Sequence, residues 1–193
     1  MQAIKTDIYE EVIIAGFGGQ GIILAGKLLA QTAMLSGMET TYMPSYGAEM
    51  RGGTANSMIV IADSPVASPL VTEPTSLIAM NKASAGKFAP RVKPDGLIVF
   101  NSSLIDELGQ INSSVDTFAV PADDIAVELG NLKIANMVIV GAYLAKRNLL
   151  SVDQAAAALP YILAERYHKT LPINIEALHR GAELAKTLGK TGS

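Results

Sequence analysis

Short apolar runs alternate along the chain with longer stretches of helical periodicity. Apolar runs typical of buried strands lie at Val12–Ala15, Asn56–Ala62, Leu77–Met80 and Leu97–Phe100, with weaker strand candidates at Thr40–Met43 and Thr117–Val120. Helical spacing covers about Ile22–Ser36, Ala122–Leu129, Ile134–Asn148, Val152–His168 and Ile173–Leu188, and a weak helix precedes Pro90. This alternation predicts an α/β fold: a three-layer α/β/α arrangement with a mostly parallel central sheet and a helical C-terminal third.

Glycine and proline positions predict where several of these elements end. Gly37 is expected to stop the first helix, and Pro44 to end the second strand. Three prolines between Asp63 and Thr75 predict an irregular connection. The sequence shows no internal repeat, no low-complexity run and no long linker, so we expect a single domain over residues 1–193.

Composition narrows the classes of function. The chain is 49% apolar, carries a net charge of −3 and contains no cysteine or tryptophan. Disulfides, thiolate zinc sites and cysteine-held iron–sulfur clusters are therefore excluded for this chain, and a nucleic-acid-binding face is not expected. Because the first residues lack a signal-peptide core and no apolar run approaches the length of a membrane span, we expect no membrane association and a cytoplasmic location.

The first glycine cluster, Gly16-Phe17-Gly18-Gly19-Gln20-Gly21, lies between a predicted strand and a predicted helix. Its G-x-G-x-x-G spacing permits a tight turn, and a helix start offers free N–H groups to a phosphate. A full NAD site also needs an acid at the end of the second strand, and Tyr42-Met43-Pro44-Ser45 supplies none. The cluster therefore predicts either an anion-binding loop or a turn that only packs the helix against the sheet.

The second cluster, Ser45–Gly53, concentrates side-chain chemistry among three glycines. It holds the phenol of Tyr46, the carboxylate of Glu49 and the guanidinium of Arg51, which is followed by Gly52 and Gly53. An arginine in this setting suits a phosphate or carboxylate. The alternative is a solvated loop with a weak Glu49–Arg51 ion pair.

Other polar residues give weaker signals. Asn101 and Ser102 follow a predicted strand, where they suit either a ligand site or a helix cap. Asp123 and Asp124 suit the first turn of a helix. The two histidines, His168 and His179, have no partner at helical spacing, so neither a metal site nor catalysis is expected of them.

The glycine clusters together resemble the gamma subunit of the 2-oxoacid:ferredoxin oxidoreductases, which also forms a domain of single-chain pyruvate:ferredoxin oxidoreductase. The resemblance covers essentially the whole chain; its landmarks are Gly16–Gly21, Tyr46–Gly53, Asn56-Ser57, Lys93–Ser102 and Asn136-Met137-Val138. The Arg51-Gly52-Gly53-Thr54-Ala55-Asn56 version is more similar to subunits that act on 2-oxoglutarate or branched-chain 2-oxoacids, while Met50 departs from the pyruvate type.

The resemblance implies a subunit that is not active alone and helps to form a shared coenzyme A site within a complex producing acyl-coenzyme A. Thiamine diphosphate, Mg and iron–sulfur clusters would belong to partners: a thiamine-diphosphate-binding subunit, an alpha subunit and a ferredoxin-like iron–sulfur subunit. The isolated chain could form a homodimer. No catalytic residue or metal ligand is expected here, and the expected cofactor-binding residues are Gly16, Gly18, Gly19, Gln20, Gly21, Tyr46, Glu49, Arg51, Gly52, Gly53 and Asn101.

Two alternatives remain open from the sequence. One is a free-standing Rossmann-like oxidoreductase that uses Gly16–Gly21 for NAD or a flavin. The other is a purely structural subunit whose glycine loops contact only neighbouring chains.

Overall fold

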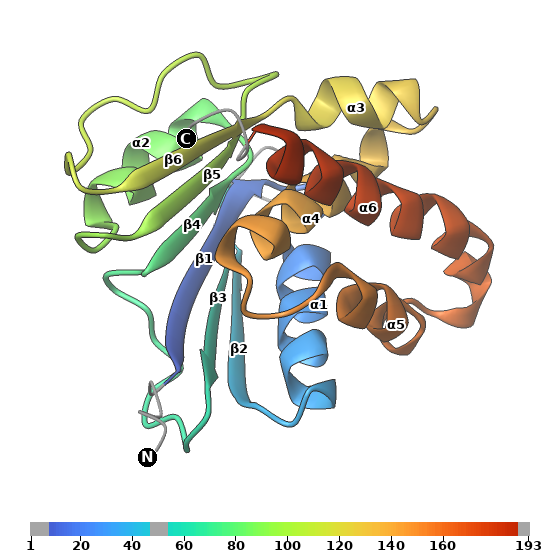
Figure 1. Ribbon diagram of the computed structural model, residues 1–193, viewed down its shortest axis with the longest axis horizontal. Helices are drawn as coiled ribbons and strands as arrows, with labels where there is room; N and C mark the ends of the chain where they lie inside the picture. Colours follow the sequence, from blue (N-terminus) through green and yellow to red (C-terminus); the bar gives the residue numbers. More distant parts are fainter. Residues whose placement is uncertain (1–7, 47–53, 189–193) are drawn as a thin grey trace.

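A computed structural model describes residues 8–46 and 54–188 of the chain. Within these residues, six strands form one sheet in the order β2-β3-β1-β4-β5-β6 (Figure 1). The strands are β1 (Tyr9–Phe17), β2 (Glu39–Tyr46), β3 (Thr54–Ala62), β4 (Ser76–Ala79), β5 (Leu97–Asn101) and β6 (Asp116–Val120). Each of the predicted apolar runs thus corresponds to a strand, although Met80 lies one residue beyond the end of β4.

The strand directions confirm a mostly parallel sheet. β4 pairs with β1, β5 with β4 and β6 with β5, all in parallel. β3 is antiparallel to both β1 and β2, so it alone among the described strands runs the opposite way. The carboxyl ends of the other strands therefore meet at one edge of the sheet.

Helices cover the two faces of the sheet unequally. They are α1 (Ile22–Leu35), α2 (Lys82–Phe88), α3 (Ala122–Glu128), α4 (Ala135–Arg147), α5 (Val152–Ile162) and α6 (Leu171–Leu188). Figure 1 shows α1, α4, α5 and α6 stacked on one side of the sheet and α2 on the other. The predicted three-layer α/β/α architecture and helical C-terminal third are confirmed.

The central strand β1 explains why two cores form. Its side chains alternate, with Val12 and Ile14 in the core beneath α1 and α4, and Ile13 and Ala15 in the core on the α2 side. All four are fully buried, which accounts for a continuous apolar run in the sequence.

Two glycines bring α4 and α6 into close contact. A Cβ atom added to Gly141 would lie 1.9 Å from the Leu178 carbonyl oxygen, and one added to Gly181 would lie 1.8 Å from the Val138 carbonyl oxygen. Since both obstacles are backbone atoms that cannot rotate away, only glycine allows this packing.

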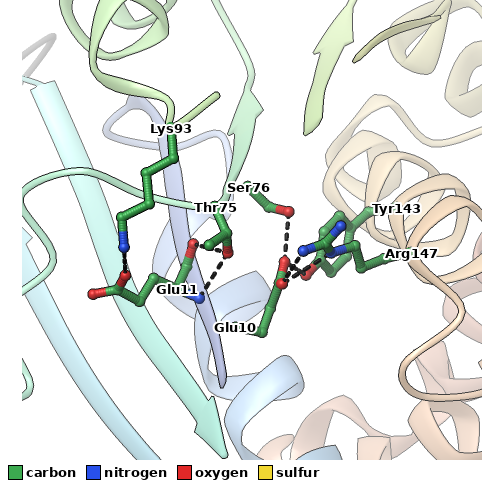
Figure 2. Close-up of polar contacts among 7 residues, drawn as sticks. All are labelled: Glu10, Glu11, Thr75, Ser76, Lys93, Tyr143 and Arg147. Atoms are coloured by element: carbon green, nitrogen blue, oxygen red, sulfur yellow. Dashed lines mark hydrogen bonds and ion pairs between the residues drawn. The ribbon is translucent and has the colours of Figure 1, made fainter. Parts of the chain in front are cut away.

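A buried carboxylate joins β1, β4 and α4 at the amino end of β1 (Figure 2). Glu10 is 3% exposed. Its Oε1 accepts hydrogen bonds from the Ser76 hydroxyl at 2.5 Å and the Tyr143 hydroxyl at 3.1 Å. Its Oε2 accepts two from Arg147, Nε at 2.9 Å and Nη2 at 2.5 Å. We call these four residues the Glu10 cluster.

The Glu10 cluster changes the acidity of its members. Burial, and then the neighbouring Glu10 carboxylate, raise the pKa of Tyr143 well above its ordinary value. The hydrogen bonds to Glu10 raise the pKa of Arg147. Next to the cluster, Lys93 pairs with Glu11, and the Thr75 hydroxyl donates to the Glu11 carbonyl oxygen at 3.0 Å (Figure 2). These contacts fix the start of β1 from both sides.

The helix predicted over Val152–His168 is too long. α5 begins as expected, with a capping box formed by Ser151 and Gln154, but it ends at Ile162, where Leu163 becomes extended. Glu165–Thr170 then forms a 3-10 helix with no buried residue, so no apolar face holds it in the α form. α6 starts at Leu171, two residues earlier than predicted, and Pro172 lies inside its first turn.

The prediction that Pro44 ends a strand is also wrong. Pro44 lies within β2 opposite Ser57, and the strand continues to Tyr46. Because β2 is an edge strand, a residue without an N–H group is tolerated on its open side. Gly37 does follow α1, with a φ of +77°, and 63–75 contains no helix or strand.

Candidate functional site

The glycine loop, residues 16–21, lies where the chain changes direction across the sheet. The connection from β1 through α1 leads to β2 on one side of β1, whereas β4, β5 and β6 lie on the other side. A crevice at such a reversal is the usual ligand site of open α/β sheets. The loop therefore occupies the edge position between β1 and β4 that the fold makes available for binding.

Two left-handed glycines shape this loop. Gly19 has a φ of +97° and Gly21 a φ of +73°, a backbone region that other residues rarely adopt. Gly21 is the N-cap of α1, and neither a side-chain cap nor an acidic residue occupies the first turn of that helix. The first N–H groups of α1 are thus left without a side-chain acceptor, as an anion-binding helix start requires.

Gln20 braces the loop from within. Its Oε1 accepts hydrogen bonds from the Phe17 N–H at 2.7 Å and the Asn81 amide at 3.0 Å. Its Nε2 donates to the Met80 carbonyl oxygen at 3.2 Å. A Cβ on Gly16 would lie 2.7 Å from the Gln20 Oε1, so Gly16 makes room for this brace. These contacts tie the loop to the end of β4.

Asn136, at the start of α4, is a positioning residue whose role sequence reasoning missed. Its Nδ2 donates to the Gly21 carbonyl oxygen at 3.1 Å. A Cβ on Gly21 would lie 2.3 Å from that nitrogen, so this contact requires glycine. The side chain is buried, and its Oδ1 has no hydrogen-bond partner in the described part of the chain. The Asn136 motif was a landmark of the resemblance, but nothing in the sequence linked it to Gly21.

Three hollows surround the first turns of α1, and we name each by its neighbouring element. The β4 hollow, about 470 Å³, lies between Gly19, Gln20, Met80 and the segment 130–135. The β2 hollow, about 430 Å³, is lined by Phe17, Gly18, Gly19, Gly21, Lys27 and Tyr46, among others. The α5 hollow, about 450 Å³, includes Leu24, Lys133, Ile162, Leu163 and Tyr167. Gly19 separates the first two hollows.

Lysines contribute the positive charge of these hollows. Lys27 lines the β2 hollow, and Lys133 lines both the β4 and the α5 hollows. Neither amino group has a hydrogen-bond or ion-pair partner among the described residues. Other cations are engaged, for example Lys146 with Asp116 at 3.5 Å and Arg180 with Glu128 at 3.2 Å. Sequence reasoning missed both lysines because a lone lysine on a helix or in a connection forms no motif.

Of the predicted site residues in the second glycine cluster, only Tyr46 lies within the described residues. Tyr46 ends β2, is 69% exposed and lines the β2 hollow, so it does meet the glycine loop. Glu49, Arg51, Gly52 and Gly53 lie outside the described residues.

Asn101 is fully buried and caps a helix. Its Oδ1 accepts from the Ala122 N–H at 3.1 Å at the start of α3, and its Nδ2 donates to Asp123 at 2.7 Å. Asn101 therefore makes the contacts of a helix cap, one of the two roles that its position after a strand suggested. Asp123, which lines the β4 hollow, is held by this bond in the first turn of α3.

Both histidines lie away from the glycine loop. His168 contacts the Leu163 carbonyl oxygen at 3.0 Å, and His179 lies 3.6 Å from Asp153 on α5. Among residues 8–46 and 54–188, no group of three or more histidine or acidic side chains is placed to hold a metal ion. No helix in the same residues is long and apolar enough to span a membrane.

Comparison with known proteins decides the family. The Pyruvate ferredoxin/flavodoxin oxidoreductase family matches residues 11–184, which is most of the chain. The chain belongs to this family. The matched residues include both the glycine loop and the segment that lines the hollows, and together with the gamma-subunit structure described below they confirm the resemblance to gamma subunits.

Two curated relatives of the family show different lengths. The chain is 33% identical over 190 residues to 2-oxoglutarate synthase subunit KorC of Methanocaldococcus jannaschii, covering 97% of this chain and all of that one. It is 37% identical over 177 residues to ketoisovalerate oxidoreductase subunit VorA of Methanothermobacter thermautotrophicus. That match covers 91% of this chain but only 36% of VorA, so the chain spans about a third of that relative.

Solved structures of the family share the fold. The gamma subunit of a keto/oxoacid ferredoxin oxidoreductase from Geobacter sulfurreducens superposes with a TM-score of 0.78 at 27% identity, covering 92% of this chain and 99% of that one. A 2-oxoglutarate:ferredoxin oxidoreductase from Magnetococcus marinus superposes with a TM-score of 0.83 at 24% identity, and the match covers 93% of this chain and 31% of that one. The latter structure holds 2-oxoglutarate, coenzyme A and succinyl-CoA.

Proposed function

We propose that this chain is the gamma-type subunit of a 2-oxoacid:ferredoxin oxidoreductase and that it forms part of the coenzyme A site. Within that complex, residues 1–193 act as one gamma-type domain. The oxidation takes place on thiamine diphosphate with Mg in a partner subunit, and the electrons leave through iron–sulfur clusters in partner chains. This division fits a sequence with no cysteine to ligate a cluster.

The glycine loop with its two lysines is the observation that carries the proposal. Coenzyme A brings a diphosphate and a ribose phosphate, and both need positive charge and N–H donors. The open first turn of α1, which follows Gly19 and Gly21, supplies the donors, and Lys27 and Lys133 supply charge from opposite hollows. The coenzyme A of the Magnetococcus complex supports the choice of ligand.

The strand order disfavours the NAD or flavin alternative. In a dinucleotide site, the acid that binds the ribose follows the strand next to β1. Here the neighbour of β1 on that side is the antiparallel β3, and β2 lies one strand further away, about 10 Å from β1. The described end of β2, Pro44-Ser45-Tyr46, also has no acid.

For the substrate of the complex we propose 2-oxoglutarate, since the relative that this chain matches over its full length carries that name. The ketoisovalerate relative makes a branched-chain 2-oxoacid the competing outcome. We propose the cytoplasm as the compartment, because a chain without cysteine gains nothing from an oxidising one. The expected partners are a thiamine-diphosphate-binding subunit, an alpha subunit and a ferredoxin-like subunit.

Two glycines of like backbone conformation give a controlled test of coenzyme A binding. Gly19 and Gly37 both have positive φ and open space around the Cβ position, but only Gly19 lines the hollows. In the assembled complex, Gly19→Val should raise the KM for coenzyme A at least tenfold, because a β-branched residue forces the loop out of shape. Gly37→Val should lower thermal stability and leave the KM unchanged.

Purification of the complex tests the partner assignment. Tagged chain should recover a thiamine-diphosphate-binding chain and a cysteine-rich chain, and the complex should reduce ferredoxin only with coenzyme A and a 2-oxoacid, fastest with 2-oxoglutarate. A purified chain that carries NAD or a flavin and works alone would support the free-standing alternative. If Gly19→Val and Gly37→Val complexes have the same KM for coenzyme A, the loop contacts only neighbouring subunits.

A further inference from the structure

The α5 hollow has no role in the binding described so far, although it adjoins the glycine-loop site. We propose that this hollow and Lys133 form a subsite for the adenosine 3′-phosphate end of the ligand, a proposal that rests on coenzyme A being bound at the glycine loop. The purine would occupy the α5 hollow, and the Lys133 ammonium would contact the 3′-phosphate at its border. The diphosphate would then lie beside Gly19 and the first turn of α1.

The two hollows form one continuous path for such a ligand. Asn131 and Lys133 line both the β4 and the α5 hollows, so the connection between α3 and α4 is their common wall. The Asn131 side chain accepts a hydrogen bond from the Lys133 N–H at 3.1 Å, which fixes the backbone of this wall. A ligand whose charged centre lies at Gly19 can therefore extend past Lys133 without crossing a helix.

The chemistry of the α5 hollow suits a purine. Leu24, Ile134 and Ile162 give it apolar walls, and Tyr167, 48% exposed, supplies an aromatic ring at its mouth. The Asn131 Nδ2 and the Asn174 Oδ1 have no hydrogen-bond partner in the described chain and can meet the polar edge of a base, whereas the Asn174 Nδ2 is already bonded to Thr170 at 2.7 Å. Apolar faces with a few convergent polar groups are what a nucleoside pocket requires, and stacking on an aromatic ring is available to any base.

Charge places the phosphate at the Lys133 border. Asp123 is the acidic residue of the β4 hollow, and its Oδ1 is already held by Asn101 at 2.7 Å. The Lys133 amino group, by contrast, has no partner in the described chain. Arg166 lies over the Tyr167 ring, with its Cζ 4.9 Å from the ring centroid, and adds a second positive charge near the mouth. A phosphate dianion forms strong charge-assisted hydrogen bonds with an ammonium group, and the Lys133 amino group is available for them at this border.

A two-ligand comparison tests the subsite. In the assembled complex, we would measure kcat/KM for coenzyme A and for dephospho-coenzyme A, which lacks the 3′-phosphate. Lys133→Gln should lower the ratio of the two values about tenfold, the effect of one lost charge-assisted hydrogen bond. Lys169→Gln is the matched control: Lys169 also lacks a partner in the described residues but lines none of the three hollows, and the ratio should not change.

The outcomes separate this proposal from the proposed function. A Lys133→Gln complex whose kcat/KM falls equally with both ligands would place Lys133 on the diphosphate and overturn the subsite, and so would a complex whose kcat/KM changes with neither ligand. Either result would leave coenzyme A binding intact, whereas a wild-type complex that does not use coenzyme A would overturn the proposed function itself.

Filling the hollow gives an independent measurement. Ala164 is exposed and lines the α5 hollow, so Ala164→Trp should obstruct it without removing a packed side chain. We expect adenosine 3′,5′-bisphosphate to compete with coenzyme A in the wild-type complex and at least tenfold more weakly in the variant. Equal inhibition of both complexes would exclude the α5 hollow as the purine site.

Discussion

Replacing Arg147 with methionine tests how strongly the Glu10 cluster stabilises the fold. Arg147 donates two of the four hydrogen bonds that Glu10 accepts, and Glu10 is 3% exposed. Methionine keeps much of the aliphatic stem of arginine but removes the charge. The variant would leave a buried carboxylate with only the hydroxyl groups of Ser76 and Tyr143 as donors.

The expected loss is about 2–3 kcal/mol in the free energy of unfolding. Removing one partner of a fully buried ion pair costs about 3–5 kcal/mol. The Arg147 side chain is 33% exposed, so water can reach the space that it leaves and reduce the loss. For a chain of this length, such a loss corresponds to a decrease in Tm of about 5–10 °C.

Urea unfolding of the full chain at pH 7 measures the effect. Arg180→Met is the matched control, because Arg180 pairs with Glu128 at 3.2 Å with side chains that are 42% and 65% exposed, and its loss should stay below about 1 kcal/mol. Adding Glu10→Gln to Arg147→Met should recover about 1 kcal/mol by removing the unpaired charge. Equal losses in Arg147→Met and Arg180→Met would refute the reasoning from burial.

Three further predictions concern other contacts of the fold. Because the pKa of Tyr143 is raised in the folded state, the protonated hydroxyl stabilises the fold fully below pH 10, and this stabilisation is lost as the pH rises above 10. In a series of thermal melts between pH 9.5 and 11, Tyr143→Phe should therefore show a smaller decrease in Tm than the wild-type chain. Gly141→Ala should cost about 3 kcal/mol in urea unfolding because its Cβ meets the α6 backbone, whereas Gly86→Ala, in open space on α2, should be neutral or stabilising. Asn101→Ala should cost about 1–2 kcal/mol in the same assay and leave the KM for coenzyme A of the complex unchanged, because it removes a buried cap rather than a ligand contact.

The sequence predicted the strands better than their arrangement. Val12–Ala15 and Leu77–Met80 were predictable as strands because both of their faces are buried, and a strand buried on both faces shows a continuous apolar run in the sequence. The insertion of the antiparallel β3 between β1 and β2 could not be read, since an apolar run does not encode its pairing partner. Pro44 misled the prediction because only the edge position of β2, a property of the whole sheet, makes a proline acceptable there.

The candidate site was predicted in part. Glycines at Gly16–Gly21 mark the loop because the local backbone demands them, with positive φ at Gly19 and Gly21. The contributions of Asn136 and Lys133 come from more than a hundred residues further along the chain, and only the packing of α4 and of the turn that precedes it brings them to the loop. The buried role of Glu10 was not predicted for the same reason, because its partner Arg147 is 137 residues away in the sequence.

The fold links the Glu10 cluster to the glycine loop through α4, which is fixed to that loop at one end and to β1 at the other. Asn136 holds Gly21 at one end, and Arg147 holds Glu10 at the other. The two α4 residues are eleven positions apart, about 16 Å along a helix. Between these ends, Gly141 locks α4 against α6 through backbone contact. Because that contact lies between the two ends, the loss of Arg147 should loosen the last turn of α4 and leave the Asn136 contact in place. We therefore expect Arg147→Met to increase amide hydrogen exchange at 144–147 but to change the KM for coenzyme A less than threefold.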